Sequence, residues 1–229
     1  MRKFYIAYLM TMITLLGLTL TVPAHGAGSG GGGMGSGTYN ENRRALTPEQ
    51  KSAKAFRAGI KYRDRALAQE RKAEKAKTPK SAERALAKAR KHYLKAKEHQ
   101  GEAIQLDPRN YKAANELGFA LRKVGDYRKA IGAYNYALNI NPKFHEATEY
   151  RAEAFLALGM LDQTRQSYMV LFREDRGLAQ QLMERIDAWI VEQGEPANEA
   201  HKTFIAWVDE RKRIASITKD LSMNNTRSW

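Results

Sequence analysis

The chain has 229 residues, of which 39 are Lys or Arg and 25 are Asp or Glu, so its formal net charge is +14. It contains no cysteine, which excludes disulfides, thiolate metal sites and thiol nucleophiles. The composition is rich in Ala, Lys, Arg and Leu and therefore favours an all-α chain, long enough to bury a sizeable core.

The first segment, residues 1–26, has the order of a secretory signal peptide. A basic start precedes an apolar run over residues 4–22, and small residues follow it. Cleavage after Ala24 and cleavage after Gly26 both fit this order, and an uncleaved membrane anchor is the alternative. Either form predicts an exported protein, periplasmic or extracellular, with a bacterial envelope as the preferred setting.

Residues 27–46 follow as a flexible linker whose first half is rich in glycine. The glycine-rich stretch lacks a Gly-Lys-Ser/Thr ending and a preceding strand, so a phosphate-binding loop is not expected. Its composition is typical of a tether that is too entropic to order. The helical domain is expected over residues 47–218, and residues 219–229 are expected to be a frayed tail.

Positive charge is concentrated in the first part of this helical domain. A threonine before a proline opens a helix at position 47, and Thr78 and Pro79 form a second helix stop and start. Residues 63–95 hold twelve Lys or Arg against four Asp or Glu, a net charge of +8. Residues 108–229 hold eighteen against sixteen, a net charge of +2. The basic character of the protein is therefore local.

Residues 111–144 form a unit that contains two short amphipathic helices joined by a turn at 124–126. Small residues stand where the helices must cross, bulky residues stand beside them, and a proline ends the second helix. These positions are Leu117, Gly118, Leu121, Ala130, Tyr134, Ala137 and Pro142. The unit resembles a tetratricopeptide (TPR) repeat in its length and in these residues, although Ala114 replaces a usual bulky aromatic. The resemblance implies a solenoid of antiparallel helix pairs that holds another molecule.

The same spacing predicts an extended repeat before this unit and a degenerate one after it. Tyr62 and Ala96 lie thirty-four residues apart, where an ordinary repeat separates the equivalent positions by nine. The insertion of about twenty-five residues predicts that both helices of the first repeat are prolonged and project as a hairpin, here called the arm. The predicted units are an extended repeat 47–110, a repeat 111–144, a degenerate repeat 145–177 and capping helices 178–218. The expected fold class is thus an all-α, TPR-like α-solenoid.

In TPR proteins the first helices of the pairs usually line a concave groove that holds the partner. Transferred by position, this family feature predicts seven groove residues: Lys112, Asn115, Phe119, Arg122, Glu146, Glu149 and Glu153. The groove is then basic at one end and acidic at the other. Chaperone-binding TPR domains clamp a C-terminal carboxylate with Lys, Asn and Arg, and the three glutamates disfavour such a clamp here. A protein or peptide segment of mixed charge fits better, and plain exposed polar surface is the alternative.

The arm offers a second candidate site at its presumed tip. Six basic residues gather there: Arg71, Lys72, Lys75, Lys77, Lys80 and Arg84. One interpretation is a solvated helical pair that uses these charges for solubility. The other is docking on a polyanion, such as an anionic membrane, a cell-wall polymer or an acidic protein. Nucleic acid is not an expected partner, because the signal segment removes the protein from it and no aromatic residues interleave the tip charges.

No catalytic or cofactor-binding pattern is present. The five histidines are scattered without the spacing of metal ligands, and no nucleophile motif occurs. The sequence therefore predicts no enzyme, no cofactor and no metal site. It predicts an exported, non-catalytic scaffold or adaptor for a protein or peptide partner in the cell envelope. The alternative is an electrostatic tether whose basic arm docks on an anionic surface; the oligomeric state is not predicted.

Overall fold

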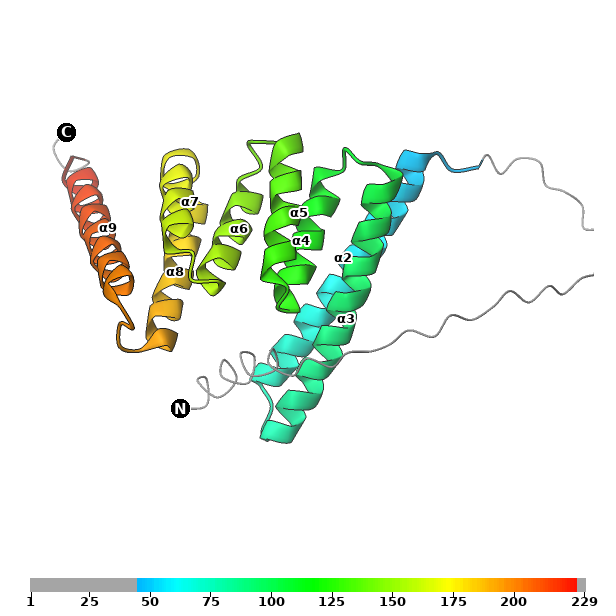
Figure 1. Cartoon of the computed structure of the whole chain (residues 1–229), viewed down its shortest axis with the longest axis horizontal. Helices are drawn as coiled ribbons and strands as arrows, with labels where there is room; N and C mark the ends of the chain where they lie inside the picture. Colours follow the sequence, from blue (N-terminus) through cyan, green and yellow to red (C-terminus); the bar gives the residue numbers. More distant parts are fainter. Residues whose placement is uncertain (1–44, 226–229) are drawn as a thin grey trace, which may run out of the picture.

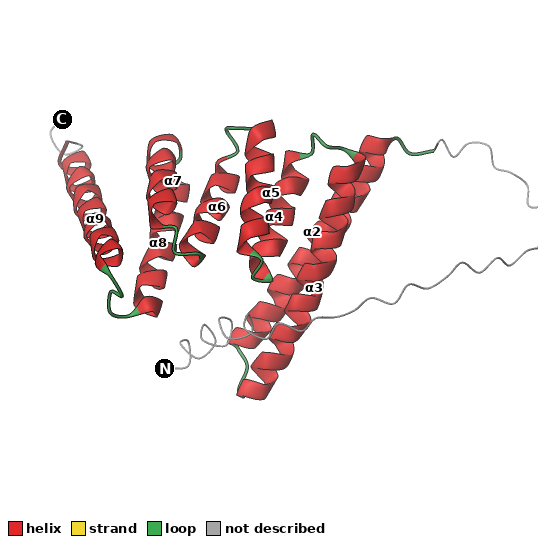
Figure 2. Cartoon of the chain, in the orientation of Figure 1, coloured by secondary structure: helices red, strands yellow, loops and turns green. Residues whose placement is uncertain are grey.

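The computed structural model describes residues 45–225, which form eight helices and no strand (Figures 1 and 2). The helices are α2 Pro48–Glu74, α3 Pro79–Leu106, α4 Tyr111–Lys123, α5 Tyr127–Ile140, α6 His145–Ala157, α7 Leu161–Glu174, α8 Arg176–Gln193 and α9 Glu199–Asn225. Figure 1 shows them stacked in one row, with the α2–α3 pair at one end and α9 at the other. The expected fold class, an all-α, TPR-like α-solenoid, is confirmed. The predicted signal peptide, most of the linker and the last four residues lie outside the described residues.

The two central helix pairs repeat each other at one fixed interval along the chain. The helix α4 begins at Tyr111 and α6 at His145, and α5 begins at Tyr127 and α7 at Leu161. Gly125 and Gly159 close the two interhelical turns with φ values of 89° and 68°, a left-handed conformation that favours glycine. The helices of each pair therefore reverse direction at equivalent positions.

The first pair is elongated into the projecting arm, as the insertion predicts. The helix α2 has 27 residues against 13 in α4, and α3 has 28 against 14 in α5. At 1.5 Å per residue, α2 is about 40 Å long and α4 about 20 Å. The far half of the hairpin thus extends past the row, as Figure 1 shows. Its turn is held by Thr78, which caps α3 by accepting a hydrogen bond from the Ser81 backbone N–H.

An alanine seam holds the arm together. Ala66, Ala73 and Ala89 are buried between α2 and α3, and Tyr93 is buried in the same seam. Leu67, the neighbour of Ala66 on α2, is only half-buried. Because alanine side chains are short, the two long helices approach closely while their other faces remain in solvent.

At the centre of the solenoid, α4 and α5 also approach each other closely, at a glycine. Tyr134 on α5 is fully buried, and its ring lies against the backbone of Gly118 on α4. A Cβ atom at position 118 would lie 2.5 Å from Cε1 of that ring. The absence of a side chain at Gly118 is therefore a packing requirement of the α4–α5 pair.

Two further helices cap the row beyond α7. Leu182 and Ile186 of α8 and Phe204 and Val208 of α9 are buried in the last core cluster. Trp207 and Trp189 are half-buried and pack against this cluster. The end of the solenoid is thus closed by large apolar side chains.

We expect Gly118→Ala to lower the free energy of unfolding by about 1–2 kcal/mol, because the new methyl group must displace the buried Tyr134 ring. Gly132→Ala is the matched control on α5, since a Cβ there meets no atom within 4 Å. It should raise stability by about 0.5–1 kcal/mol through helix propensity. Chemical denaturation monitored by circular dichroism measures both, and equal shifts for the two variants would contradict this account of the packing.

Candidate functional site

The first helices of the pairs, α2, α4, α6 and α8, approach one another along the row. Their facing side chains define the surface called here the first-helix face. The second helices, α3, α5, α7 and α9, stand further apart. Neighbouring repeats are joined mainly where the second helix of one pair meets the first helix of the next, and the first helices add contacts across the first-helix face. The seven predicted groove residues lie on α4 and α6, two of these first helices.

Arg122 lies at the centre of this face, between two aromatic rings. Its guanidinium carbon is 5.3 Å from the ring centroid of Phe119 and 5.3 Å from that of Tyr150. Its Nη1 donates a hydrogen bond to Glu153 Oε2 on α6. Arg185 Nε on α8 lies 3.8 Å from the other Glu153 oxygen. One carboxylate thus connects α4, α6 and α8.

Two more ion pairs connect the arm to α4. Arg63 Nη1 donates to Glu116 Oε1 at 2.7 Å, and Lys123 Nζ lies 2.8 Å from Glu70 Oε1. These side chains are largely shielded, so the pairs are less screened than ordinary surface pairs. The arm is therefore fixed to the central repeat by charge as well as by packing.

This arrangement corrects the predicted charge gradient, which required a free basic end and a free acidic end. Arg122 and Glu153 neutralise each other, because stacking brings position 122 of one repeat beside position 153 of the next. Asn115 and Glu149 are buried, with relative exposures of 4% and 2%, so they are not open groove positions. Lys112 and Glu146 are exposed, and Phe119 is half-buried. A binding role for the seven residues stays a prediction.

Sequence reasoning missed Arg63, Glu116, Tyr150 and Arg185 as members of this face. Their partners lie at separations such as 53 residues for Arg63 and Glu116, and no local pattern marks such a pair. A partial signal did exist for Tyr150, which lies three residues before Glu153 and hence on a similar side of α6.

Glu149 is the most perturbed carboxyl group of the face. Burial, together with the charge of Glu153 and a hydrogen bond with it, raises the pKa of Glu149 to about 8. Arg122 and Arg185 oppose this rise without cancelling it. Glu149 is therefore protonated in the folded protein at neutral pH and can donate to the Glu153 carboxylate.

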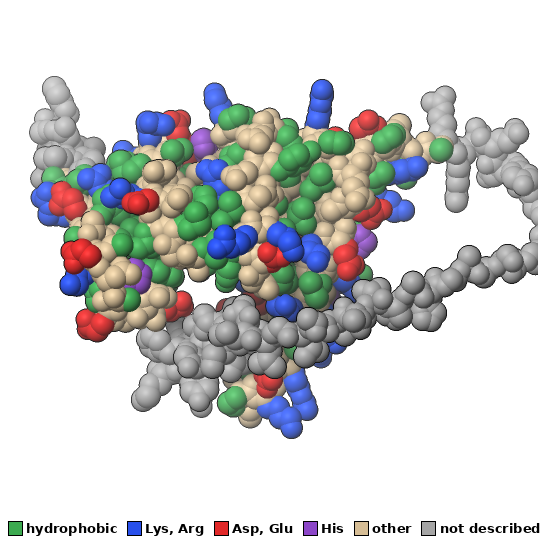
Figure 3. Space-filling model, viewed as in Figure 1, with side chains coloured by type: hydrophobic (Ala, Val, Ile, Leu, Met, Phe, Trp, Pro, Cys, Tyr) green, Lys and Arg blue, Asp and Glu red, His purple; other side chains and the backbone are tan. Residues whose placement is uncertain are grey.

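The six predicted tip residues of the arm (Arg71, Lys72, Lys75, Lys77, Lys80 and Arg84) are all exposed. None of them takes part in an ion pair with another residue of the described range 45–225. Figure 3 shows basic side chains at the lower end of the arm, which projects beyond the other helices. The structure thus brings these charges together and leaves them uncompensated.

Within the described range, no three or more His, Asp or Glu side chains gather in a way that could hold a metal ion. None of the helices between residues 45 and 225 is long and apolar enough to cross a membrane.

No protein-family model matches the chain, and no curated protein matches it. Solved structures similar to it include three TPR domains. The TPR domain of Arabidopsis OM64 is 16% identical, with 69% of this chain and 98% of that domain covered and a TM-score of 0.35. The first TPR of Spaghetti (RPAP3), bound to an HSP90 peptide, is 17% identical, with 66% and 95% covered and a TM-score of 0.35. The second TPR domain of human RPAP3, in complex with an HSP70 peptide, is 15% identical, with 68% and 98% covered and a TM-score of 0.34.

The TPR-like description of this chain therefore rests on its own geometry. The helices of the two central pairs start at the same interval, glycines close their equivalent turns, and Gly118 meets a buried tyrosine.

Because the pKa of Glu149 is raised in the folded state, its protonation contributes to the free energy of unfolding. This contribution is complete below the ordinary pKa of 4.5 and is lost as pH rises through about 8. We expect Glu149→Gln, which retains a neutral donor, to match the original chain near pH 4. Above pH 8 it should be more stable by on the order of 2 kcal/mol. Urea denaturation across this pH range measures the difference. The exposed Glu146→Gln on the same helix is the control, and identical pH profiles for the two variants would contradict the prediction.

Proposed function

We propose that this protein is a non-catalytic scaffold that holds a protein or peptide segment on its first-helix face. The observation that carries the proposal is the set of ion pairs that connects α2 to α4 and α4 to α6 and α8 through Arg63, Glu116, Arg122, Glu153 and Arg185. These pairs fix the spacing of four helices before any partner arrives. A preformed surface loses less conformational entropy on binding than a surface that must order itself.

The chemistry of the face favours a segment of mixed charge. Lys112 and Glu146 remain exposed on neighbouring helices, and the half-buried rings of Phe119 and Tyr150 lie beside Arg122. A partner with one acidic and one basic group around an apolar residue would match this pattern. A terminal carboxylate alone would not, because Arg122 is already paired with Glu153.

The proposed setting is the cell envelope. The basic start and apolar run of residues 1–26 are those of a secretory signal, so the scaffold would act in the periplasm or outside the cell. An uncleaved segment would hold it at the membrane instead. Detection of the N-terminus of the protein from envelope fractions by mass spectrometry distinguishes these two forms.

The test of the first-helix face is a double charge swap, Lys112→Glu with Glu146→Lys, which leaves the net charge unchanged. Both side chains are exposed, so the swap should not disturb folding. We expect recovery of the specific partner from envelope extract to fall about tenfold, as measured by quantitative mass spectrometry. The control swap is Arg128→Glu with Asp209→Lys, on exposed positions of α5 and α9. Equal recovery by the two variants would exclude the first-helix face as the site.

A second candidate function is electrostatic tethering through the arm. The observation that favours it is the contrast between the paired cations of the first-helix face and the six exposed, unpaired cations at the tip. Residues 63–95 carry a net charge of +8 on a hairpin that projects beyond the stack. Such a patch is attracted to anionic headgroups or wall polymers at a range of about one Debye length, roughly 8–10 Å at physiological salt.

Replacement of the six tip cations by glutamate should abolish co-sedimentation with phosphatidylglycerol vesicles at low salt, because the attraction becomes repulsion. The original chain should bind and be released as salt rises from about 0.05 to 0.5 M. A control variant with six exposed cations replaced on α5 to α9 should retain binding. Binding that ignores salt, or that persists after the tip reversal, would refute the tether.

A further inference from the structure

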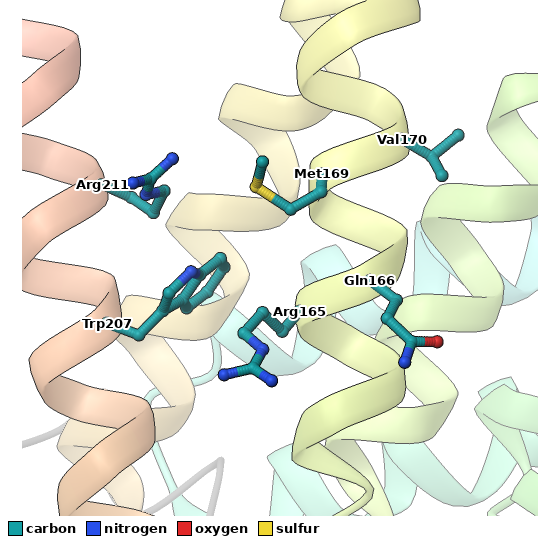
Figure 4. A pocket seen from close by; sticks show the side chains of 6 residues that line it. All are labelled: Arg165, Gln166, Met169, Val170, Trp207 and Arg211. Carbon is teal, nitrogen blue, oxygen red and sulfur yellow. The ribbon is translucent and has the colours of Figure 1, made fainter.

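In the described part of the chain, a hollow lies on the side of the second helices, away from the first-helix face. It has a volume of about 480 Å³ and lies between α7 and α9, lined by Arg165, Gln166, Met169, Val170, Trp207 and Arg211. Figure 4 shows Trp207 and Arg211 directed from α9 toward Met169 and Arg165 of α7. A second hollow, of about 460 Å³, lies across α7 and shares Gln166 and Val170 with the first. The two hollows thus adjoin along α7.

The floor of the α7–α9 hollow is apolar and incompletely covered. Met169 and Val170 are 40% and 38% exposed, although they are consecutive apolar residues on a helix surface. Trp207 packs against Tyr168, with ring centroids 5.4 Å apart, and stacks on Phe204, with ring centroids 5.7 Å apart. The rest of its side chain lines the hollow. The hollow exists because α9 approaches α7 at few residues. A half-buried indole beside an exposed thioether is typical of binding surfaces.

The rim of both hollows is cationic. None of the residues that line them is acidic, and three are arginines: Arg151, Arg165 and Arg211. Arg151 donates to the Asn135 amide oxygen at 2.7 Å and lies over the Phe155 ring. Burial without a compensating carboxylate lowers the pKa of Arg151. This arginine therefore lies in surroundings that a carboxylate would stabilise.

The other two arginines can also pair with a carboxylate from a partner. Arg211 makes no ion pair with any residue in the described range, and its buried Nε has no hydrogen-bond partner there. Arg165 lies 3.2 Å from Asp162, but both side chains are largely exposed, so this pair contributes little and can be exchanged. The rim thus offers three cations for which the described chain supplies no strong partner.

We propose that the α7–α9 hollow and its neighbour form a second docking surface for an acidic peptide segment that inserts a bulky apolar side chain. The apolar side chain would lie against Trp207 and Met169, and its flanking carboxylates would pair with Arg211 and Arg165. A longer segment would cross Val170 and reach Arg151. Charge complementarity selects this occupant, because a second copy of a chain with a net charge of +14 would meet the same arginines with repulsion.

This site is separate from the first-helix face, so either proposal can fail without the other. An anionic membrane shares the preference for cations and apolar groups. The peptide is favoured because the apolar residues line a hollow between two helices and do not protrude from the surface.

The test is a selection of random displayed peptides of about twelve residues on the purified full chain. We expect the selected peptides to be rich in Asp and Glu around Phe, Leu or Trp. The double variant Met169→Asp with Arg211→Glu should lose them, with at least a tenfold lower affinity in fluorescence anisotropy. Arg128→Glu, an exposed charge reversal on α5, is the control and should retain them. The Lys112→Glu and Glu146→Lys swap on the first-helix face should retain them as well.

Circular dichroism and a melting curve check that the double variant folds. If it does not, Met169→Asp alone serves, because that side chain is already 40% exposed. Three results would overturn the proposal: a selection without acidic, apolar peptides, selected peptides that bind the folded variant equally well, or binding to phosphatidylglycerol vesicles through this surface without any peptide selected. Saturable shifts of the Met169 methyl resonance with a selected peptide would place the contact directly.

Discussion

Close approach between helices at small residues is the constraint on which the rest of this molecule depends. Gly118 offers no Cβ to the ring of Tyr134, and a methyl group there would overlap it. Ala130, Ala137 and Ala147 are fully buried in the same central cluster. In a solenoid each helix pair contacts only its neighbours, so it must pack tightly against them to exclude water. The positions of the polar side chains on both sides of the row follow from this packing.

Close approach at small residues also holds together the arm, whose helices are longer than those of the neighbouring pairs. Its seam consists mostly of alanine, which allows α2 and α3 to stay in close contact along their whole length. The helix α4 is shorter and packs against only part of that length. Beyond that support the two helices have only each other, and their outer faces are in solvent. Lys and Arg suit such positions because their long stems cover backbone while their charges stay hydrated. The tip is thus the place where uncompensated charge costs least in folding and is most accessible to a partner.

Charge is divided between two kinds of environment. On the first-helix face the cations of Arg63, Arg122 and Lys123 meet carboxylates from neighbouring helices and act between repeats. At the arm tip and around the α7–α9 hollow the cations lack such partners within the described chain. The first group stabilises the position of the helices, and the other two are free to meet anions from outside. The proposed functions follow this division: the first-helix face has the paired cations, and the arm tip and the α7–α9 hollow have cations without carboxylate partners on neighbouring helices.

The sequence by itself determined the helix pairs, the interval at which they repeat, the elongated first pair and the basic arm tip. These features depend on residue spacing along the chain. For example, Tyr62 and Ala96 are thirty-four residues apart, whereas an ordinary repeat separates the equivalent positions by nine. Only the tertiary structure decided that Arg122 is paired with Glu153, that Glu149 is buried and protonated, and that Trp207 and Met169 border a shared hollow. These contacts join residues 31 or more positions apart or depend on the burial that stacking creates. Their energies depend on distance and desolvation in space, and neither quantity is fixed by local spacing.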